Sequence, residues 1–180
     1  LMQQPHEYEE FMTKFSVSEI GINLNIGHLN LAANAFDFDR FAFVDLIENY
    51  ILFTSIEGKD VKILGKNHQY LGVGNALQAL EDIENNKGRM GVFWHTQGSG
   101  KSLSMVFYSG QIITHPQMKN PTIVILTDRN DLDDQLFGTF GNCVGLLRQT
   151  PVQAKNREHI KELLKVSGGG VIFTTIQKFS

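Results

Sequence analysis

The chain has 180 residues, 42% of them hydrophobic and 19% charged, with a formal net charge of −3 and a pI near 6.1. No apolar run approaches the roughly 20 residues that a membrane span needs. The single cysteine, Cys143, excludes an internal disulfide and fits a reducing cytoplasm. The acidic balance also argues against a broad basic face for nucleic acid, so a DNA partner would need basic surface elsewhere in a longer protein.

The first 66 residues differ from the rest in composition and in hydrophobic periodicity, and we expect them to form a mostly helical linker. Residues 12–34 are rich in asparagine and show little hydrophobic periodicity. Apolar residues then repeat at helical spacing over residues 41–53, with Asp39 as the expected N-cap. Residues 58–60 predict a turn and residues 61–64 a short strand.

From residue 67 onward, short apolar runs alternate with helical patterns. The expected helices are residues 70–85, 102–114, 128–137 and 154–166, and the expected strands are residues 90–94, 122–127 and 171–175. Strands that are continuous apolar runs between helices predict a parallel sheet covered on both faces. Ligands bind at the carboxyl ends of such strands, where His95, Asp128 and Thr174–Thr175 fall.

A glycine-rich segment, residues 95–102 with the sequence HTQGSGKS, separates the first of these strands from its helix. Its glycines let successive backbone N–H groups point at one anion, and the following helix adds its partial positive charge. Lys101 is placed to reach the β- and γ-phosphates, and the Ser102 hydroxyl to ligate Mg²⁺. His95 stands where the strict pattern has glycine, but the two later glycines are kept where the phosphates would sit. The segment therefore predicts a phosphate loop that binds a nucleoside triphosphate.

Hydrolysis of a triphosphate also needs an acid that holds Mg²⁺ and orients water. Asp128, directly after an apolar run, is one candidate; an acid on a strand beyond Ser180 is the other, and we favour the second. Three strands are few for such a sheet. We therefore expect the chain to be an excerpt of a larger protein and to have no ATPase or nuclease activity alone. If Asp128 were the magnesium acid, the loop would instead belong to a small kinase or nucleotide-dependent switch.

Four stretches occur in a characteristic order. They are VKILGKNHQY at residues 61–70, WHTQGSGKS at residues 94–102, TDRNDLDDQL at residues 127–136 and FTTIQKF at residues 173–179. Together they resemble the motor motifs of the restriction (R) subunit of type I restriction-modification enzymes, over roughly residues 36–180. The resemblance implies an α/β fold: a parallel-sheet P-loop NTPase of the RecA-like, helicase superfamily-two type, present in part.

The resemblance also implies roles for individual residues. Lys101 and Ser102 would be catalytic, binding phosphate and Mg²⁺. The nucleotide would be held by Gln69, Gln97, Gly98, Ser99, Gly100, Lys101 and Ser102. Gln69 is assigned to adenine, with a solvent-exposed residue at a helix start as the alternative. DNA would be contacted by Thr127, Asp128, Arg129, Thr174, Thr175 and Gln177.

A member of this family is expected to be an ATP-dependent translocase that pulls double-stranded DNA toward methylation (M) and specificity (S) subunits before a separate nuclease domain cuts it. Residues 1–66 would then be the linker that follows the nuclease domain, and residues 67–180 the amino-terminal part of the first motor domain. The expected cofactors are ATP and Mg²⁺, and the expected location is the cytoplasm, without membrane contact. Another superfamily-two helicase or remodelling ATPase is the nearest alternative, and a module that only binds nucleotide or DNA is a third.

Overall fold

The computed structural model describes residues 40–56, 58–166 and 168–179 of the chain. The chain divides into two compact units, residues 1–47 and residues 48–180. Residues 12–34 and the predicted N-cap residue Asp39 lie outside the described residues. Within the described ranges, no helix is both long enough and apolar enough to cross a membrane.

The described part of residues 1–66 is a helix followed by a β-hairpin. Helix α2 (Arg40–Asn49) ends before the expected boundary, and strand β1 (Ile51–Ile56) pairs in antiparallel register with β2 (Lys59–Leu64). Gly58, with φ +76°, makes the turn. The prediction that the helix continues to residue 53 is wrong, and so is a mostly helical linker in this part. The run ILFTSI is rich in β-branched and aromatic residues, and pairing with β2 decides its conformation.

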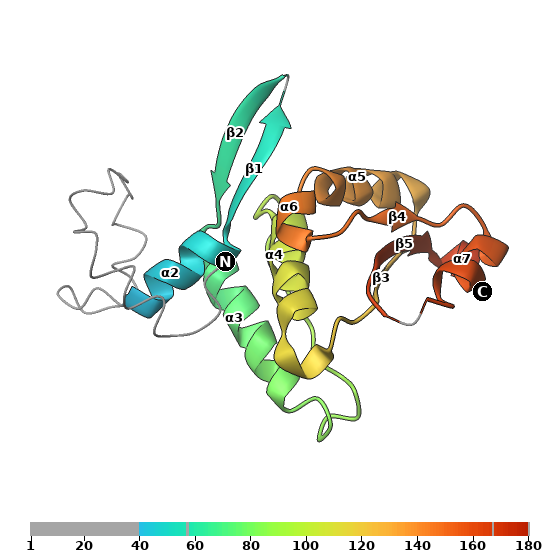
Figure 1. Cartoon of the computed structure of the whole chain (residues 1–180), viewed down its shortest axis with the longest axis horizontal. Helices are drawn as coiled ribbons and strands as arrows, with labels where there is room; N and C mark the ends of the chain where they lie inside the picture. Colours follow the sequence, from blue (N-terminus) through green and yellow to red (C-terminus); the bar gives the residue numbers. More distant parts are fainter. Residues whose placement is uncertain (1–39, 57, 167, 180) are drawn as a thin grey trace. The chain divides into compact units, whose positions relative to one another are not determined.

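Two helices frame the phosphate loop. Helix α3 (Asn67–Glu81) begins three residues before the expected position, and helix α4 (Lys101–Thr114) begins at the end of the loop. The two helices pack against each other (Figure 1). The Phe107 side chain of α4 is fully buried, and its ring centroid lies 5.3 Å from that of Tyr50. A short 3₁₀ helix, η2 (Pro116–Met118), follows the helix break that Pro116 predicts.

A parallel three-stranded sheet forms the second half of the unit of residues 48–180. Its order is β3 (Ile123–Thr127), β5 (Val171–Thr175), β4 (Val152–Gln153). The predicted parallel sheet is confirmed, with β4 as a strand that the sequence did not reveal. The prediction that both faces are covered does not hold at β3 among the described residues, because Val124 and Leu126 are 39% and 49% exposed. The strands are connected by α5 (Asn130–Gly141), α6 (Val144–Leu147) and α7 (Arg157–Leu163), and α8 (Ile176–Phe179) follows β5. Helix α5 covers one face, because the rings of Phe137 and Phe140 lie 5.5 and 5.0 Å from that of Phe173.

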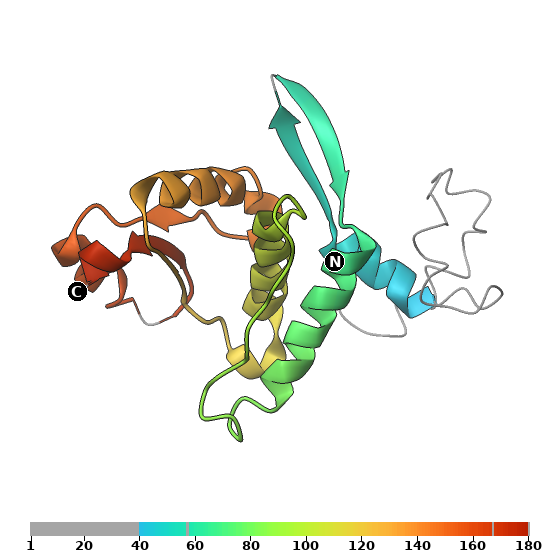
Figure 2. The same ribbon diagram turned by 180° about the vertical axis from the view of Figure 1, so that it is seen from behind.

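The apolar run before the phosphate loop is not a strand, so the prediction for residues 90–94 is wrong. The run passes along α4 as an irregular trace in Figure 2 and belongs to neither of the two described sheets. Val92 is 95% exposed and Trp94 77% exposed. Strand conformation depends on a neighbouring strand that satisfies the backbone N–H and C=O groups. No described strand pairs with this run, and its apolar composition does not replace that partner.

Candidate functional site

The backbone of the phosphate loop uses glycine at two positions. Gly98 and Gly100 have φ values of +78° and +83°, in the left-handed region that side chains disfavour. His95 is not among the residues with positive φ, so the backbone places no demand for glycine there. This explains why the loop tolerates histidine at the position where the strict pattern has glycine. Helix α4 starts directly after Gly100, so its positive end faces the loop.

The ammonium group of Lys101 is held inside the loop. Its Nζ donates hydrogen bonds to the carbonyl oxygens of His95 at 3.0 Å and Thr96 at 3.1 Å. These carbonyls are neutral acceptors, and a phosphate oxygen would be a charged and therefore stronger one. Lys101 is thus placed to exchange its two loop carbonyls for the phosphates of a bound nucleotide.

Two polar atoms of the loop are buried without a hydrogen-bond partner. They are the Ser99 hydroxyl oxygen and the His95 Nδ1. A buried polar group without a partner costs about 1–3 kcal/mol. An anion in the loop would accept a hydrogen bond from the Ser99 hydroxyl, so the residues present fit a phosphate group. Among the described side chains, no group of three or more His, Cys, Asp or Glu residues is arranged to hold a metal ion.

The first turn of α3 fastens the loop through two side chains. Gln69 Nε2 donates to the Gly100 carbonyl at 2.9 Å, and His68 Nε2 lies 2.9 Å from the Ser99 carbonyl. Gln69 Oε1 also accepts from the Lys66 N–H at 2.8 Å, which satisfies a backbone donor at the start of the helix. Gln69 is only 2% exposed, so its alternative assignment to a solvent-exposed position is wrong. Both ends of its amide are engaged by main-chain groups.

Histidine and phenylalanine rings extend this contact between α3 and the loop. The ring centroids of His68 and His95 are 5.1 Å apart, and those of Phe93 and His95 are 4.5 Å apart. A Cβ at Gly72 of α3 would lie 2.7 Å from the Phe93 ring, so a larger residue there would require the ring to shift. The sequence analysis assigned no role to His68. Its position beside Gln69, in the same helical turn, was the available signal.

The predicted DNA-contacting residues fall into two groups at the carboxyl edge of the sheet. Three of them are buried, namely Thr127, Thr174 and Thr175, and three are exposed, namely Asp128, Arg129 and Gln177. Gln177 Nε2 donates to the Asp128 carbonyl at 3.0 Å, which joins the ends of β3 and β5. Only the exposed group presents side chains to a ligand.

A buried carboxylate that the sequence analysis missed supports this edge. Asp133 is fully buried and accepts hydrogen bonds from Thr127 Oγ1 at 3.1 Å and from Gln153 Nε2 at 2.7 Å. Asp133 lies in the first turn of α5 and Gln153 in β4, so the carboxylate links three elements. An acid in a first helical turn has a sufficient explanation in the helix dipole, and the sequence held no sign of the Gln153 partner.

Comparison with known proteins decides the family. Residues 68–180 match the SWI2/SNF2 ATPase family. The chain belongs to this family. It is 49% identical over 141 residues to the type I restriction enzyme HindI endonuclease subunit of Haemophilus influenzae, covering 76% of this chain and 13% of that protein. It is 31% identical over 147 residues to the putative type I restriction enzyme MjaIXP endonuclease subunit of Methanocaldococcus jannaschii, covering 79% of this chain and 13% of that protein.

The SWI2/SNF2 match confirms the resemblance and the partial RecA-like fold that the motifs predicted. Residues 68–180 are part of an ATPase domain, which implies nucleotide binding. The matched range contains the phosphate loop, the first turn of α3 and the whole parallel sheet. The chain spans about 13% of the length of these two relatives.

Proposed function

We propose that the chain is the ATP-dependent double-stranded DNA translocase module of a type I restriction endonuclease subunit. The observation that carries the proposal is the phosphate loop, in which Lys101 is poised on two carbonyls and the Ser99 hydroxyl lacks a partner. That loop lies in a SWI2/SNF2 ATPase segment whose relatives are named type I restriction enzyme endonuclease subunits. ATP supplies the energy, and the module couples its hydrolysis to DNA pulling.

At the loop, we assign a separate role in nucleotide binding to each residue from its position. Lys101 binds the terminal phosphates, Ser102 ligates Mg²⁺, and Gln97 through Gly100 cradle the phosphate oxygens with backbone N–H groups. We assign Gln69 mainly to support of the loop, because its amide already bonds the Gly100 carbonyl and the Lys66 N–H. Contact with adenine would require Gln69 to give up one of these bonds.

At the carboxyl edge of the sheet, the proposed DNA contacts are made by the exposed side chains Arg129 and Gln177 and by the backbone around Asp128. The buried threonines Thr127, Thr174 and Thr175 act behind this surface and hold the strand ends in place. Burial in part of a protein only increases when further parts are added, so direct contact of these threonine side chains with DNA is disfavoured.

The remaining assignments concern the whole protein. Residues 1–66 would connect a nuclease domain to the motor, and residues 67–180 would begin the first motor domain. The M and S subunits would be partners of the full-length protein, which would act in the cytoplasm. The family name favours one alternative: a remodelling ATPase with the same loop and no restriction partners.

Displacement of a triplex-forming oligonucleotide from linear double-stranded DNA tests the proposal. We expect the full-length protein, assembled with its M and S subunits, to displace the oligonucleotide with ATP and not with a non-hydrolysable analogue. The time lag should grow with the distance between the recognition site and the triplex. Displacement without M and S subunits would favour the remodelling alternative, and ATP hydrolysis without displacement would refute translocation.

A further inference from the structure

At the carboxyl edge of the sheet, an acidic segment follows β3 and a basic segment follows β4. The two segments meet at Gln153 of β4, whose Nε2 donates to Asp133 at 2.7 Å and to Asp134 at 2.8 Å. The β3 corner, which we define as residues 128–134, contains four carboxylates and one guanidinium, that of Arg129. Three of the carboxylates are exposed, those of Asp128, Asp131 and Asp134. Carboxylates repel the phosphate backbone of DNA over about 10 Å at moderate salt. The β3 corner is therefore a poor surface for phosphate, although the sequence motifs place DNA contacts there.

The segment that directly follows β4 is basic. We define the β4 corner as residues 154–158 together with Lys178. Lys155 and Arg157 are exposed, Lys178 is half-buried, and the one acid is Glu158. Lys178 Nζ donates to the Ala154 carbonyl at 3.1 Å, which joins α8 to the end of β4 and places three cations at one corner.

The two corners belong to one continuous edge. The Gln177–Asp128 hydrogen bond joins α8 to the end of β3, and the adjacent residue Lys178 joins α8 to the end of β4. The order β3–β5–β4 agrees with this arrangement. A DNA backbone that follows the edge would thus pass from Gln177 to the basic side chains of the β4 corner.

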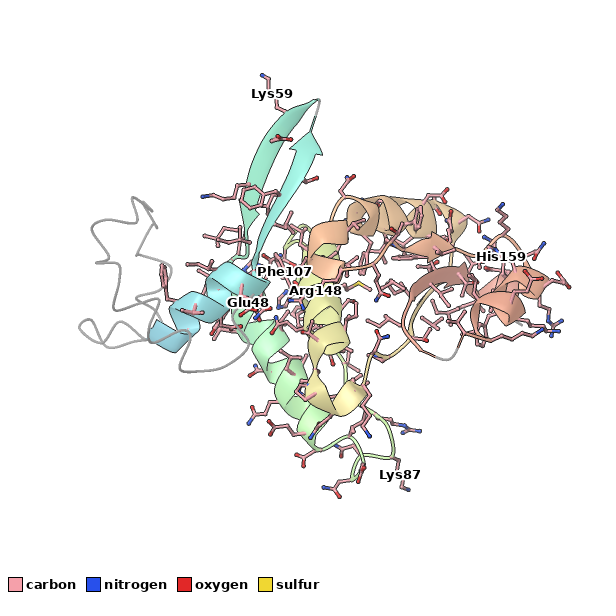
Figure 3. The ribbon with its side chains drawn as sticks, viewed as in Figure 1. Glu48, Lys59, Lys87, Phe107, Arg148 and His159 are labelled. Carbon is pink, nitrogen blue, oxygen red and sulfur yellow. The ribbon has the colours of Figure 1, made fainter. Side chains whose placement is uncertain are left out.

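Local hydrogen bonds fix the backbone of the β4 corner. The Asn156 side chain accepts from the His159 N–H at 2.9 Å, and the His159 Nδ1 accepts from the Lys155 N–H at 3.2 Å. His159 lies on α7, beside the parallel sheet at the right of Figure 3. Because the turn is held from both sides, Lys155 and Arg157 are presented from an ordered backbone.

We propose that the β4 corner, through Lys155 and Arg157, makes the main phosphate-backbone contacts of this module with double-stranded DNA. The inference rests on the proposed function and changes where its DNA is held: the β3 corner contributes Arg129 alone, while the β4 corner contributes paired cations. Contacts of this kind are independent of base sequence and depend strongly on salt.

Fluorescence anisotropy of a labelled 30-base-pair duplex, titrated with the full-length protein, tests the proposal. For the Lys155→Glu, Arg157→Glu double variant we expect the apparent Kd to rise at least about tenfold at moderate salt. In the Lys155→Ala, Arg157→Ala variant, the slope of log K against log salt should fall by about 2, because two phosphate contacts are lost. Both substituted positions, 155 and 157, are exposed, and circular dichroism checks that the variants fold.

Lys161→Glu, Lys165→Glu is the matched control. It makes the same change of charge at two exposed lysines further along the same segment, away from the strand end, and we expect less than a twofold change in Kd. An equal loss in the control would show a non-specific charge effect and overturn the proposal, as would a larger loss in Arg129→Glu than in the β4-corner variant. If the wild-type protein bound no duplex at all, the proposed function would fail together with this inference.

Discussion

The phosphate loop and the carboxyl edge of the sheet are held by different kinds of contact. The loop is fastened by polar side chains of α3, His68 and Gln69, that reach its carbonyl oxygens, while the segment before it exposes Val92 almost completely. At the edge, every residue of the central strand β5 is buried, and the buried Asp133 carboxylate bonds to both β3 and β4. The loop therefore depends on a few polar side-chain contacts, and the edge depends on burial.

This difference implies that the two regions respond to different mutations. No hydrogen bond among the described residues links the loop, residues 95–102, to the edge. Changes in the loop or in the first turn of α3 should alter nucleotide affinity with little effect on the stability of the sheet. Changes in the buried network of the edge should alter the free energy of unfolding first.

The largest effect is expected for Gly100→Ala. A left-handed backbone costs a non-glycine residue roughly 1–2 kcal/mol, and the new Cβ would lie 2.8 Å from Gln69 Nε2. Since about 1.4 kcal/mol is a factor of ten in affinity, we expect the affinity of the full-length protein for a fluorescent ATP analogue to fall well over tenfold.

Gly98→Ala is the matched control for that substitution. Gly98 has a similar φ, +78°, but open space around its Cβ position, so it isolates the backbone strain from the collision. The affinity should fall less than in Gly100→Ala. Equal losses in the two variants would show that the Gln69 contact does not matter to the loop.

A smaller effect is expected for Thr127→Val at the edge. The substitution keeps the shape of the side chain but removes a hydroxyl that donates to the fully buried Asp133. Loss of a donor to a buried carboxylate costs about 1–3 kcal/mol, measured as the free energy of unfolding of the chain in urea. Thr127→Ser retains the hydroxyl and should lose less than half as much. A neutral Thr127→Val variant would contradict the view that this network stabilises the edge.

The smallest effect is expected for Gln69→Ala, and its pattern is more informative than its size. Loss of one hydrogen bond to the loop is worth about 1 kcal/mol, or several-fold in nucleotide affinity. If Gln69 supports the loop, ATP and GTP should lose affinity equally in equilibrium titrations of the full-length protein. A loss confined to ATP would return Gln69 to the adenine-reading role that the motif resemblance assigned to it.

The sequence predicted those parts of the structure that local chemistry determines. The glycine spacing of the phosphate loop, the helix after it and the strands ending at Thr127 and Thr175 are all present. Each depends on backbone conformation or on a continuous apolar run, which are legible in one short segment of sequence.

The errors occurred where a partner outside the segment itself decides the conformation. Residues 51–56 form a strand because β2 pairs with them, although their apolar spacing also suits a helix. Residues 90–94 have the composition of a strand and no described strand beside them. The short strand β4, the His68 contact and the Asp133–Gln153 bond each join residues about 20 or more positions apart, a distance at which local patterns carry no information.

ATP hydrolysis by the full-length protein, with and without linear double-stranded DNA, tests most directly the claim that this loop powers a DNA motor. We predict that DNA stimulates turnover by the wild type and that both basal and stimulated turnover vanish in Lys101→Ala, because the ammonium group proposed to bind the phosphates is removed. Turnover that is indifferent to DNA, or that survives in Lys101→Ala, would contradict it.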